Sequence, residues 1–161
     1  MGDLAAAINT LSPGDAREAF TRCCGSRRWV DGMLARRPFA SADELFAAAD
    51  EIWGGLEPAD FLEAFAHHPA IGAQGTRGFS AHEQAQVAQA SATTLQELET
   101  LNRRYRERFG FVFLVCATGK SADEMLALLR ARIDNPADAE LRIAAGEQAK
   151  ITRLRLEKLA P

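Results

Sequence analysis

Two adjacent histidines followed by a proline, His67, His68 and Pro69, form a group suited to proton transfer. Histidine changes charge near neutral pH and is the side chain most often used as a general acid or base. The apolar pattern before them predicts a helix over 57–66, and Pro69 favours an extended conformation for the residue before it. We therefore expect His67 to complete the helix and His68 to leave it. The alternative is a structural role, a histidine at the negative end of a helix.

A second group follows a glycine-rich stretch. Residues 67–79 contain one proline and three glycines, which predicts a loop, and Ser80 with Glu83 has the spacing of a capping box. The N-terminus of a helix offers unpaired N–H groups and a positive dipole end to an anion. Glu83 and Gln84 would place a carboxylate and an amide beside such a ligand. An ordinary helix start without a ligand explains the same spacing. The binding hypothesis therefore also depends on the preceding glycines, which would let a small anion approach the backbone closely.

Arg155 is the third candidate. Ile151, Arg155 and Leu159 recur every four residues and share one face of the last predicted helix. A charge within an apolar stripe needs a partner, because burying it unpaired is costly. It could extend its guanidinium to solvent or complement the negative end of the helix. In the functional interpretation, the guanidinium pairs with a carboxylate or another planar polar ligand.

Other chemistries have weaker sequence support. His67, His68, His82 and Glu83 could in principle bind a metal, but neither the HExxH spacing nor paired cysteines occur. We therefore expect no metal site, although a metal-dependent hydrolase that uses these histidines stays an alternative. Cys116 lies in an apolar run, which raises the pKa of a thiol and disfavours a nucleophilic role. A helical interaction module without catalytic activity is the third possibility.

The elements that must hold these groups are predicted to be helices. Ser12 before Pro13 is a helix start signal, and Ser41 with Glu44 has the spacing of a capping box. Asn135–Pro136 is a helix break. The predicted helices cover residues 13–24, a short stretch around 29–33, residues 41–52, 57–66, 80–108 with a break near 93–94, 121–134 and 137–159.

One apolar run does not fit the helical pattern. Residues 109–117 would alone predict a buried strand, but no second strand is available to pair with it. We therefore expect a buried, non-helical apolar segment near 110–117 inside an all-α protein. The whole chain, residues 1–161, is expected to form a single-domain bundle of about seven to nine helices.

Composition narrows the class of protein. The chain has 161 residues, 47% of them hydrophobic and 25% charged, as in soluble globular proteins. Its formal net charge of -3 does not suggest a nucleic-acid partner, and no apolar run reaches the roughly 18 residues of a membrane span. The first residues lack the features of a signal peptide, and three cysteines, two of them adjacent, do not suggest a disulfide framework. We therefore expect a cytoplasmic protein with reduced thiols.

A series of different short motifs occurs along the chain between Ala16 and Leu159. They are Cys24-Gly-Ser-Arg-Arg-Trp29, Arg37-Pro38-Phe39, His68-Pro69-Ala70-Ile71-Gly72, Ser80-x-x-Glu83-Gln84, Leu101-Asn102-x-x-Tyr105, Phe109-Gly-Phe-Val-Phe113, Arg132, Asn135, Glu140-Leu141 and Ile151-x-x-x-Arg155-Leu156. Each motif alone is weak, but the ordered set resembles the 2-oxo-4-hydroxy-4-carboxy-5-ureidoimidazoline (OHCU) decarboxylase family of urate breakdown. The resemblance covers nearly the whole chain.

The resemblance implies an all-α fold, commonly a homodimer, and decarboxylation of OHCU to (S)-allantoin without a metal or organic cofactor. It implies that His68 is the catalytic acid/base, and we expect Glu83 to orient or polarise the substrate or His68. The residues implied to line the site or bind substrate are Pro69, Ser80, Gln84, Phe113, Leu114, Val115, Cys116, Ala117 and Arg155. The chain departs from the family at Ala70, where members often carry arginine, which removes any support from that side chain and leaves His68 untouched.

Overall fold

Helices are the only regular secondary structure in the described part of the protein. The computed structural model describes residues 3–71 and 90–161, which contain eight helices and no strand. The all-α prediction is therefore confirmed. The helices are α1 (Leu4–Asn9), α2 (Pro13–Cys23), α3 (Arg27–Arg36), α4 (Ala42–Gly54), α5 (Pro58–Phe65), α7 (Ala92–Phe109), α8 (Ala122–Arg132) and α9 (Ala137–Glu157).

The chain divides into two compact units. The first contains residues 1–64 and 148–161, and the second contains residues 65–147. Helix α9 begins in the second unit and ends in the first. Each unit has its own buried core, and each is described by itself.

Side-chain caps define the helix starts of the first unit. Ser12, Ser26 and Ser41 each accept a hydrogen bond from the backbone N–H three residues further along, which satisfies a donor that the helix itself leaves unpaired. The capping box predicted at Ser41 is only half formed. The Glu44 carboxylate accepts from the N–H of Ala40 instead of that of Ser41. Helix α1, capped by the side chain of Asp3, lies before the first predicted helix.

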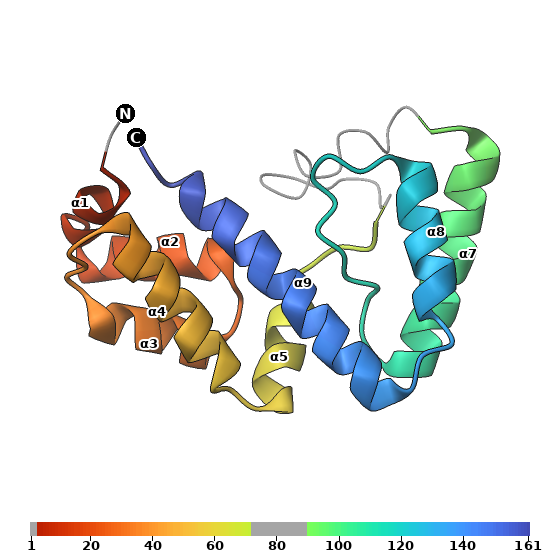
Figure 1. The fold of residues 1–161 in the computed structure, drawn as a ribbon, viewed down its shortest axis with the longest axis horizontal. Coiled ribbons are helices and arrows are strands. Elements are labelled where there is room, and N and C mark those ends of the chain that lie inside the picture. Colours follow the sequence, from red (N-terminus) through yellow and green to blue (C-terminus); the bar gives the residue numbers. More distant parts are fainter. Residues whose placement is uncertain (1–2, 72–89) are drawn as a thin grey trace. The chain divides into compact units, whose positions relative to one another are not determined.

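A buried tryptophan anchors the core of the first unit. Trp29 of α3 is fully buried and meets the ring of Phe20 from α2 edge to face, with ring centroids 5.9 Å apart. Its indole Nε1–H donates to the carbonyl oxygen of Ala49 in α4 at 3.1 Å. The α2–α4 region can be followed in Figure 1. Because the indole N–H has a partner, the large ring is buried without leaving a polar group unpaired.

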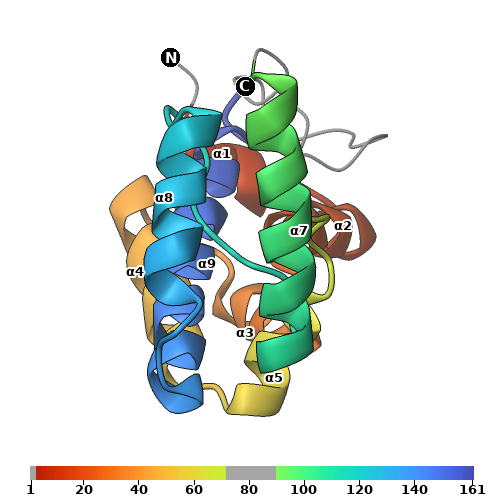
Figure 2. The same cartoon turned by 90° about the vertical axis from the view of Figure 1, so that its right-hand side faces the viewer.

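Helices α7 and α8 lie side by side in the second unit (Figures 1 and 2). Ser91 caps α7, whose first residue, Ala92, lies just before the predicted break near 93–94. The earlier part of that predicted helix falls outside the described residues. The capping box of Ser121 with Glu124 at the start of α8 is complete, as predicted.

The chain between α7 and α8 is the predicted non-helical segment. Gly110 ends α7 with a positive φ of 82°, a conformation that glycine adopts without strain. Residues 111–117 are all buried and form neither helix nor strand, and they run back along one face of the α7–α8 pair (Figures 1 and 2). Tyr105 of α7 packs against the rings of Phe111 and Phe113, with centroids 5.8 Å and 5.3 Å away. Apolar and aromatic burial therefore holds the segment in place of strand pairing.

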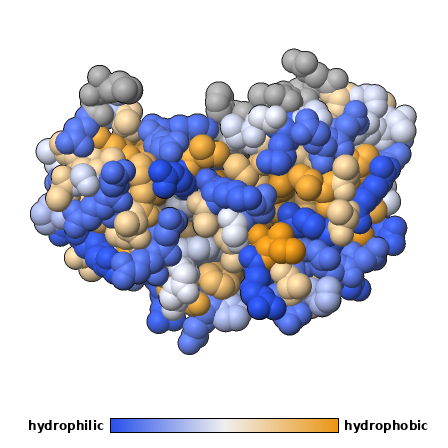
Figure 3. Space-filling view, in the orientation of Figure 1, coloured by the Kyte–Doolittle hydropathy of each residue, from blue (hydrophilic) through white to orange (hydrophobic). Residues whose placement is uncertain are grey.

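The face drawn in Figure 3 carries many hydrophilic side chains, with apolar areas between them. Among the described residues, the large apolar side chains that are exposed are those of Leu62 and Ile143, at 42% and 40%. No helix among the described residues combines the length and apolar character that a membrane span requires.

Candidate active site

His68 lies just beyond the end of α5. The helix ends at Phe65, so residues 66 and 67 form a turn, and the expectation that His67 completes the helix is wrong. The backbone N–H of His68 donates to the carbonyl oxygen of Phe65 at 3.1 Å. His68 and Pro69 are half-buried and non-helical, whereas His67 is exposed. His68 therefore leaves the helix as predicted, and Pro69 provides the reason because it disfavours a helical conformation at the preceding residue.

Asn102 fixes the chain that follows His68 and Pro69. Its side-chain Nδ2 donates to the carbonyl oxygen of Ile71 at 3.2 Å, and both residues are buried. This bond ties the short stretch after the proline to the middle of α7. The path of the chain shortly after His68 thus depends on a polar side chain of a neighbouring helix.

Three side chains hold the buried segment by its backbone. Arg132 Nη1 donates to the carbonyl oxygen of Leu114 at 2.7 Å, and Lys120 Nζ donates to that of Cys116 at 2.8 Å. The N–H of Cys116 donates to Glu147 Oε1 at 3.2 Å. These bonds replace the ladder that a strand partner would supply, because buried backbone groups need partners.

The guanidinium of Arg132 belongs to a buried ion pair. Its Nε donates to Glu140 Oε1 at 2.7 Å, and Nη2 lies 2.5 Å from the same oxygen, in a geometry that does not form a hydrogen bond. Tyr105 donates its hydroxyl to Glu140 Oε1 at 2.5 Å, and Asn135 Nδ2 donates to Oε2 at 3.0 Å. The Glu140 side chain is 0% exposed and that of Arg132 is 9% exposed. A buried charge pair is retained only with such additional hydrogen bonds.

The phenol of Tyr105 is kept neutral by this environment. Burial raises its pKa well above the usual tyrosine range, and the neighbouring Glu140 carboxylate raises the pKa further. Tyr105 therefore acts as a hydrogen-bond donor to Glu140. The arrangement links α7, α9 and, through Arg132, the segment 113–117.

Val115 has backbone groups available for a ligand. No hydrogen bond between described residues uses its N–H or its carbonyl oxygen, although the residue is only 4% exposed. Most buried backbone groups in proteins are paired. An unused donor and acceptor in the middle of the segment support its predicted contact with a polar ligand.

A cavity of about 600 Å³ opens beside these elements in the second unit. The chain after His68 and Pro69 contributes two residues to its wall, and the start of the expected substrate-binding segment contributes Phe113. Its lining residues in the described ranges are Ala70, Ile71, Leu95, Gln96, Glu99, Asn102, Arg103, Arg106, Val112 and Phe113. The volume is within the range typical of small-molecule sites.

Arg155 is buried in the first unit. The residue is 7% exposed, so the alternative in which it reaches solvent is wrong. Its Nη1 donates to the carbonyl oxygen of Arg22 in the last turn of α2 at 3.3 Å. A cation at this place complements the negative end of α2. Arg155 is thus a buried guanidinium, which is the kind of group expected to bind an anionic ligand. It also has a structural partner, the Arg22 carbonyl oxygen.

The cysteines are packing residues. Cys23, Cys24 and Cys116 are buried and form no disulfide. Burial raises the pKa of the Cys24 thiol to about 11, so at neutral pH it is protonated and a poor nucleophile.

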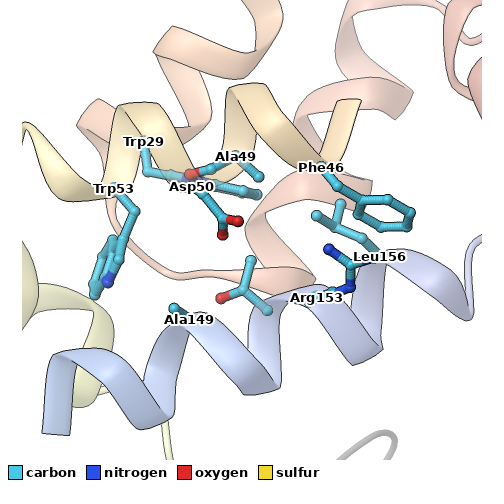
Figure 4. Close-up of a pocket in the computed structure, with 9 residues that line it drawn as sticks. Trp29, Phe46, Ala49, Asp50, Trp53, Ala149, Arg153 and Leu156 are labelled. Atoms are coloured by element: carbon cyan, nitrogen blue, oxygen red, sulfur yellow. Dashed lines mark hydrogen bonds between the residues drawn. The ribbon is translucent and has the colours of Figure 1, made fainter. Parts of the chain in front are cut away.

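A second cavity in the first unit is too small for a substrate. It lies between α4 and α9 and measures about 10 Å³, which is close to the space of one water molecule. Figure 4 shows Arg153 beside Phe46, with Asp50 directed into the gap between the two helices. The guanidinium carbon of Arg153 lies 4.3 Å from the centre of the Phe46 ring, a cation–π contact.

Part of the predicted site falls outside the described residues. Ser80, Glu83 and Gln84 are in this group, and His82 and residues 72–79 of the glycine-rich loop also lie outside. The described residues contain no cluster of three or more side chains that could hold a metal ion. Within the second unit, the stretch after His68 and Pro69 meets Phe113 at one cavity, whereas Arg155 belongs to the first unit.

Four polar residues support the candidate site, although the sequence patterns predict no individual role for them. They are Asn102, Tyr105, Arg132 and Glu140, which occur only as parts of motifs. A usable signal exists for two of them, because Asn102 and Tyr105 share a face of α7 with buried Leu98. A polar residue within an apolar stripe is the same signal that identified Arg155.

The fold and the site define an all-helical protein with a small-molecule cavity whose wall includes a buried irregular segment. The family model described as OHCU decarboxylase matches residues 9–157. The chain belongs to this family, as its motifs suggested. The match includes residues of both compact units.

Individual relatives agree with this assignment. The "Uric acid degradation bifunctional protein TTL" of Arabidopsis thaliana is 38% identical over 145 residues, which are 85% of this chain but only 45% of that protein. The "2-oxo-4-hydroxy-4-carboxy-5-ureidoimidazoline decarboxylase" of Haloferax volcanii is 28% identical, with 92% of this chain and 91% of that protein covered. The "Crystal structure of OHCU decarboxylase in the presence of (S)-allantoin" has a TM-score of 0.77 and 39% identity, and covers 87% of this chain and 95% of that one.

Proposed function

We propose that this protein decarboxylates OHCU to (S)-allantoin and CO₂ in urate degradation. One observation carries the proposal: 39% identity and a TM-score of 0.77 to an OHCU decarboxylase crystallised in the presence of (S)-allantoin, over 95% of that chain. The cavity lined by Ala70, two residues after His68, and by Phe113 of the buried segment supports it. Because the chain spans 45% of the bifunctional Arabidopsis relative, the proposal covers the decarboxylase activity alone.

The reaction can proceed without an added electron sink. The carboxylate of OHCU is attached to a ring carbon next to a C=N bond. When the bond to the carboxylate carbon breaks, CO₂ leaves and the electron pair moves into the unsaturated ring. A proton delivered to one face then completes the product. The protein must therefore orient the carboxylate, stabilise the developing charge and supply the proton.

His68 is the proposed proton-transfer group. It is a half-buried histidine beyond the end of α5, and Asn102 holds the chain that follows it. Glu83 is proposed to orient or polarise the substrate or His68, and Gln84 to hydrogen-bond the heterocycle. Pro69 and the backbone of residues 113–117 would line the ring, with Val115 offering its unused N–H and carbonyl groups. Ser80 and Arg155 are proposed to bind anionic or carbonyl groups.

The remaining sequence-based expectations are part of the same proposal. The chain 1–161 is proposed to act as one OHCU decarboxylase domain, supported by a family match that includes both compact units. A homodimer is proposed, for which the exposed Leu62 and Ile143 are candidate contacts. Three free, buried cysteines are compatible with a cytoplasmic location.

Neighbouring histidines allow a matched test of the site. We expect His68→Asn to lower kcat for OHCU by a factor of about 100 or more, the usual contribution of a general acid or base. His67→Asn changes an exposed neighbour and should leave kcat within twofold. Equal activity of the two variants would reject His68 as the proton-transfer group. A parallel assay with a chelator tests the metal-dependent alternative, which predicts loss of activity.

A further inference from the structure

Asn102 uses only one end of its side-chain amide. Nδ2 donates to the carbonyl oxygen of Ile71, whereas Oδ1 has no hydrogen-bond partner. The residue is 8% exposed. Because a carbonyl oxygen can only accept, the amide nitrogen must face Ile71, and this fixes Oδ1 on the opposite side. An unpaired polar atom at a buried position is unfavourable and is found where a ligand or function accounts for it.

The cavity of about 600 Å³ supplies a place for the missing donor. Asn102 lines it beside apolar Leu95, Val112 and Phe113, and the charged residues Glu99, Arg103 and Arg106 complete much of the wall. At its own place in this wall the neutral amide oxygen of Asn102 can only accept, so it selects a ligand group that carries an N–H. The ligand chemistry that fits is a small polar molecule with N–H donors.

We propose that Asn102 Oδ1 accepts a hydrogen bond from the ureido group of OHCU and of allantoin, and that this cavity is the subsite for that group. The inference rests on the proposed function. A ureido group carries three N–H donors outside the ring, so it can reach an acceptor that the ring need not approach. The subsite adjoins the proposed ring-binding residues, since it begins at Ala70, after Pro69, and includes Phe113.

Asn102 also positions Ile71, so the test must separate binding from positioning. (S)-Allantoin and hydantoin share the same ring, and only allantoin carries the ureido group. We expect Asn102→Ala to weaken allantoin binding about tenfold, the effect of one lost hydrogen bond. Hydantoin binding should change less than twofold. Both affinities are measured by NMR titration of the folded protein, which detects weak binding.

Two further variants complete the design. Asn102→Leu removes the acceptor while filling the space and should behave like Asn102→Ala, so it serves if the alanine variant does not fold. Arg104→Ala changes an exposed residue of the same helix that does not line the cavity and should leave both affinities unaltered. A fall in allantoin affinity below threefold, or an equal fall for hydantoin, overturns the inference. Turnover of OHCU by the unsubstituted protein separates this failure from failure of the proposed function.

Discussion

Arg132 Nη1 donates to the carbonyl oxygen of Leu114 at 2.7 Å, while Nε of the same guanidinium donates to Glu140 at 2.7 Å. The planar guanidinium thus joins a fully buried carboxylate to the segment proposed to bind substrate. Lysine could not serve both acceptors in this geometry, because its ammonium lacks the rigid fork. The shape of the proposed substrate site is therefore coupled to a buried charge pair.

Removing Arg132 should affect stability and substrate binding separately. We expect Arg132→Met to lower the free energy of unfolding by about 3–5 kcal/mol, because it leaves Glu140 buried without its cation. The double variant Arg132→Met/Glu140→Leu should recover much of that loss, since it buries no unpaired charge. Its KM for OHCU should remain raised, because the Leu114 carbonyl is still unheld. Urea unfolding and steady-state kinetics measure the two effects, and a wild-type KM in the double variant would contradict the coupling.

Tyr105 is the single tyrosine of the chain, so its ionisation can be followed directly by phenolate absorbance. Burial and Glu140 raise its pKa in the folded state. The buried Tyr105 hydroxyl therefore contributes fully to the free energy of unfolding below the usual tyrosine pKa of about 10. Above that pH its contribution declines, because only the unfolded chain ionises there. Phenolate absorbance should appear only as the helical circular dichroism is lost. Phenolate formation with the helical signal intact would show that the hydroxyl is not held as described.

Glu63 should stabilise the first unit in a pH-dependent manner. Its Oε1 accepts from the backbone N–H of Arg27 at 2.7 Å, and this bond is the main reason that the pKa of the carboxyl group is lowered. The stabilisation is present above the usual carboxyl pKa and is lost as pH falls through the lowered one. Glu63→Gln should therefore lower the melting temperature at neutral pH and have less effect in acid. Glu51→Gln, which breaks the exposed pair with Arg36, should show a smaller change, and equal effects of the two would exclude a special role for Glu63.

Arg155 tests the anion-binding part of the proposal. Arg155→Lys keeps the charge but loses the planar pair of donors that matches a carboxylate. We expect KM for OHCU to rise about tenfold or more, with a smaller change in kcat. Arg153→Lys, two residues away and exposed over Phe46, is the matched control and should leave KM unchanged. A normal KM in Arg155→Lys would assign this guanidinium to the end of α2 alone.

The sequence predicts those features that depend on neighbouring residues. Ser12 before Pro13 and Ser121 with Glu124 mark real helix starts, because capping is decided within one turn. The buried run near 110–117 was predicted from its apolar composition and its lack of a partner strand. The half-formed capping box at Ser41 shows the limit, since the Glu44 carboxylate bonds one residue away from the expected N–H.

The supporting contacts of the site could not be predicted, because they join residues far apart in the chain. Asn102 meets Ile71 across 31 positions, and Tyr105 meets Glu140 across 35. Local patterns identify these residues as polar and inward-facing but do not name their partners. The unpaired oxygen of Asn102 in particular follows from packing and has no sequence signature.

The proposed decarboxylase activity is tested most directly by the fate of fresh OHCU, generated from urate and followed by absorbance together with circular dichroism. We expect the protein to accelerate the loss of OHCU and the allantoin formed to be the S enantiomer. A chelator should change neither result. Racemic allantoin formed at the spontaneous rate would rule out the decarboxylase function.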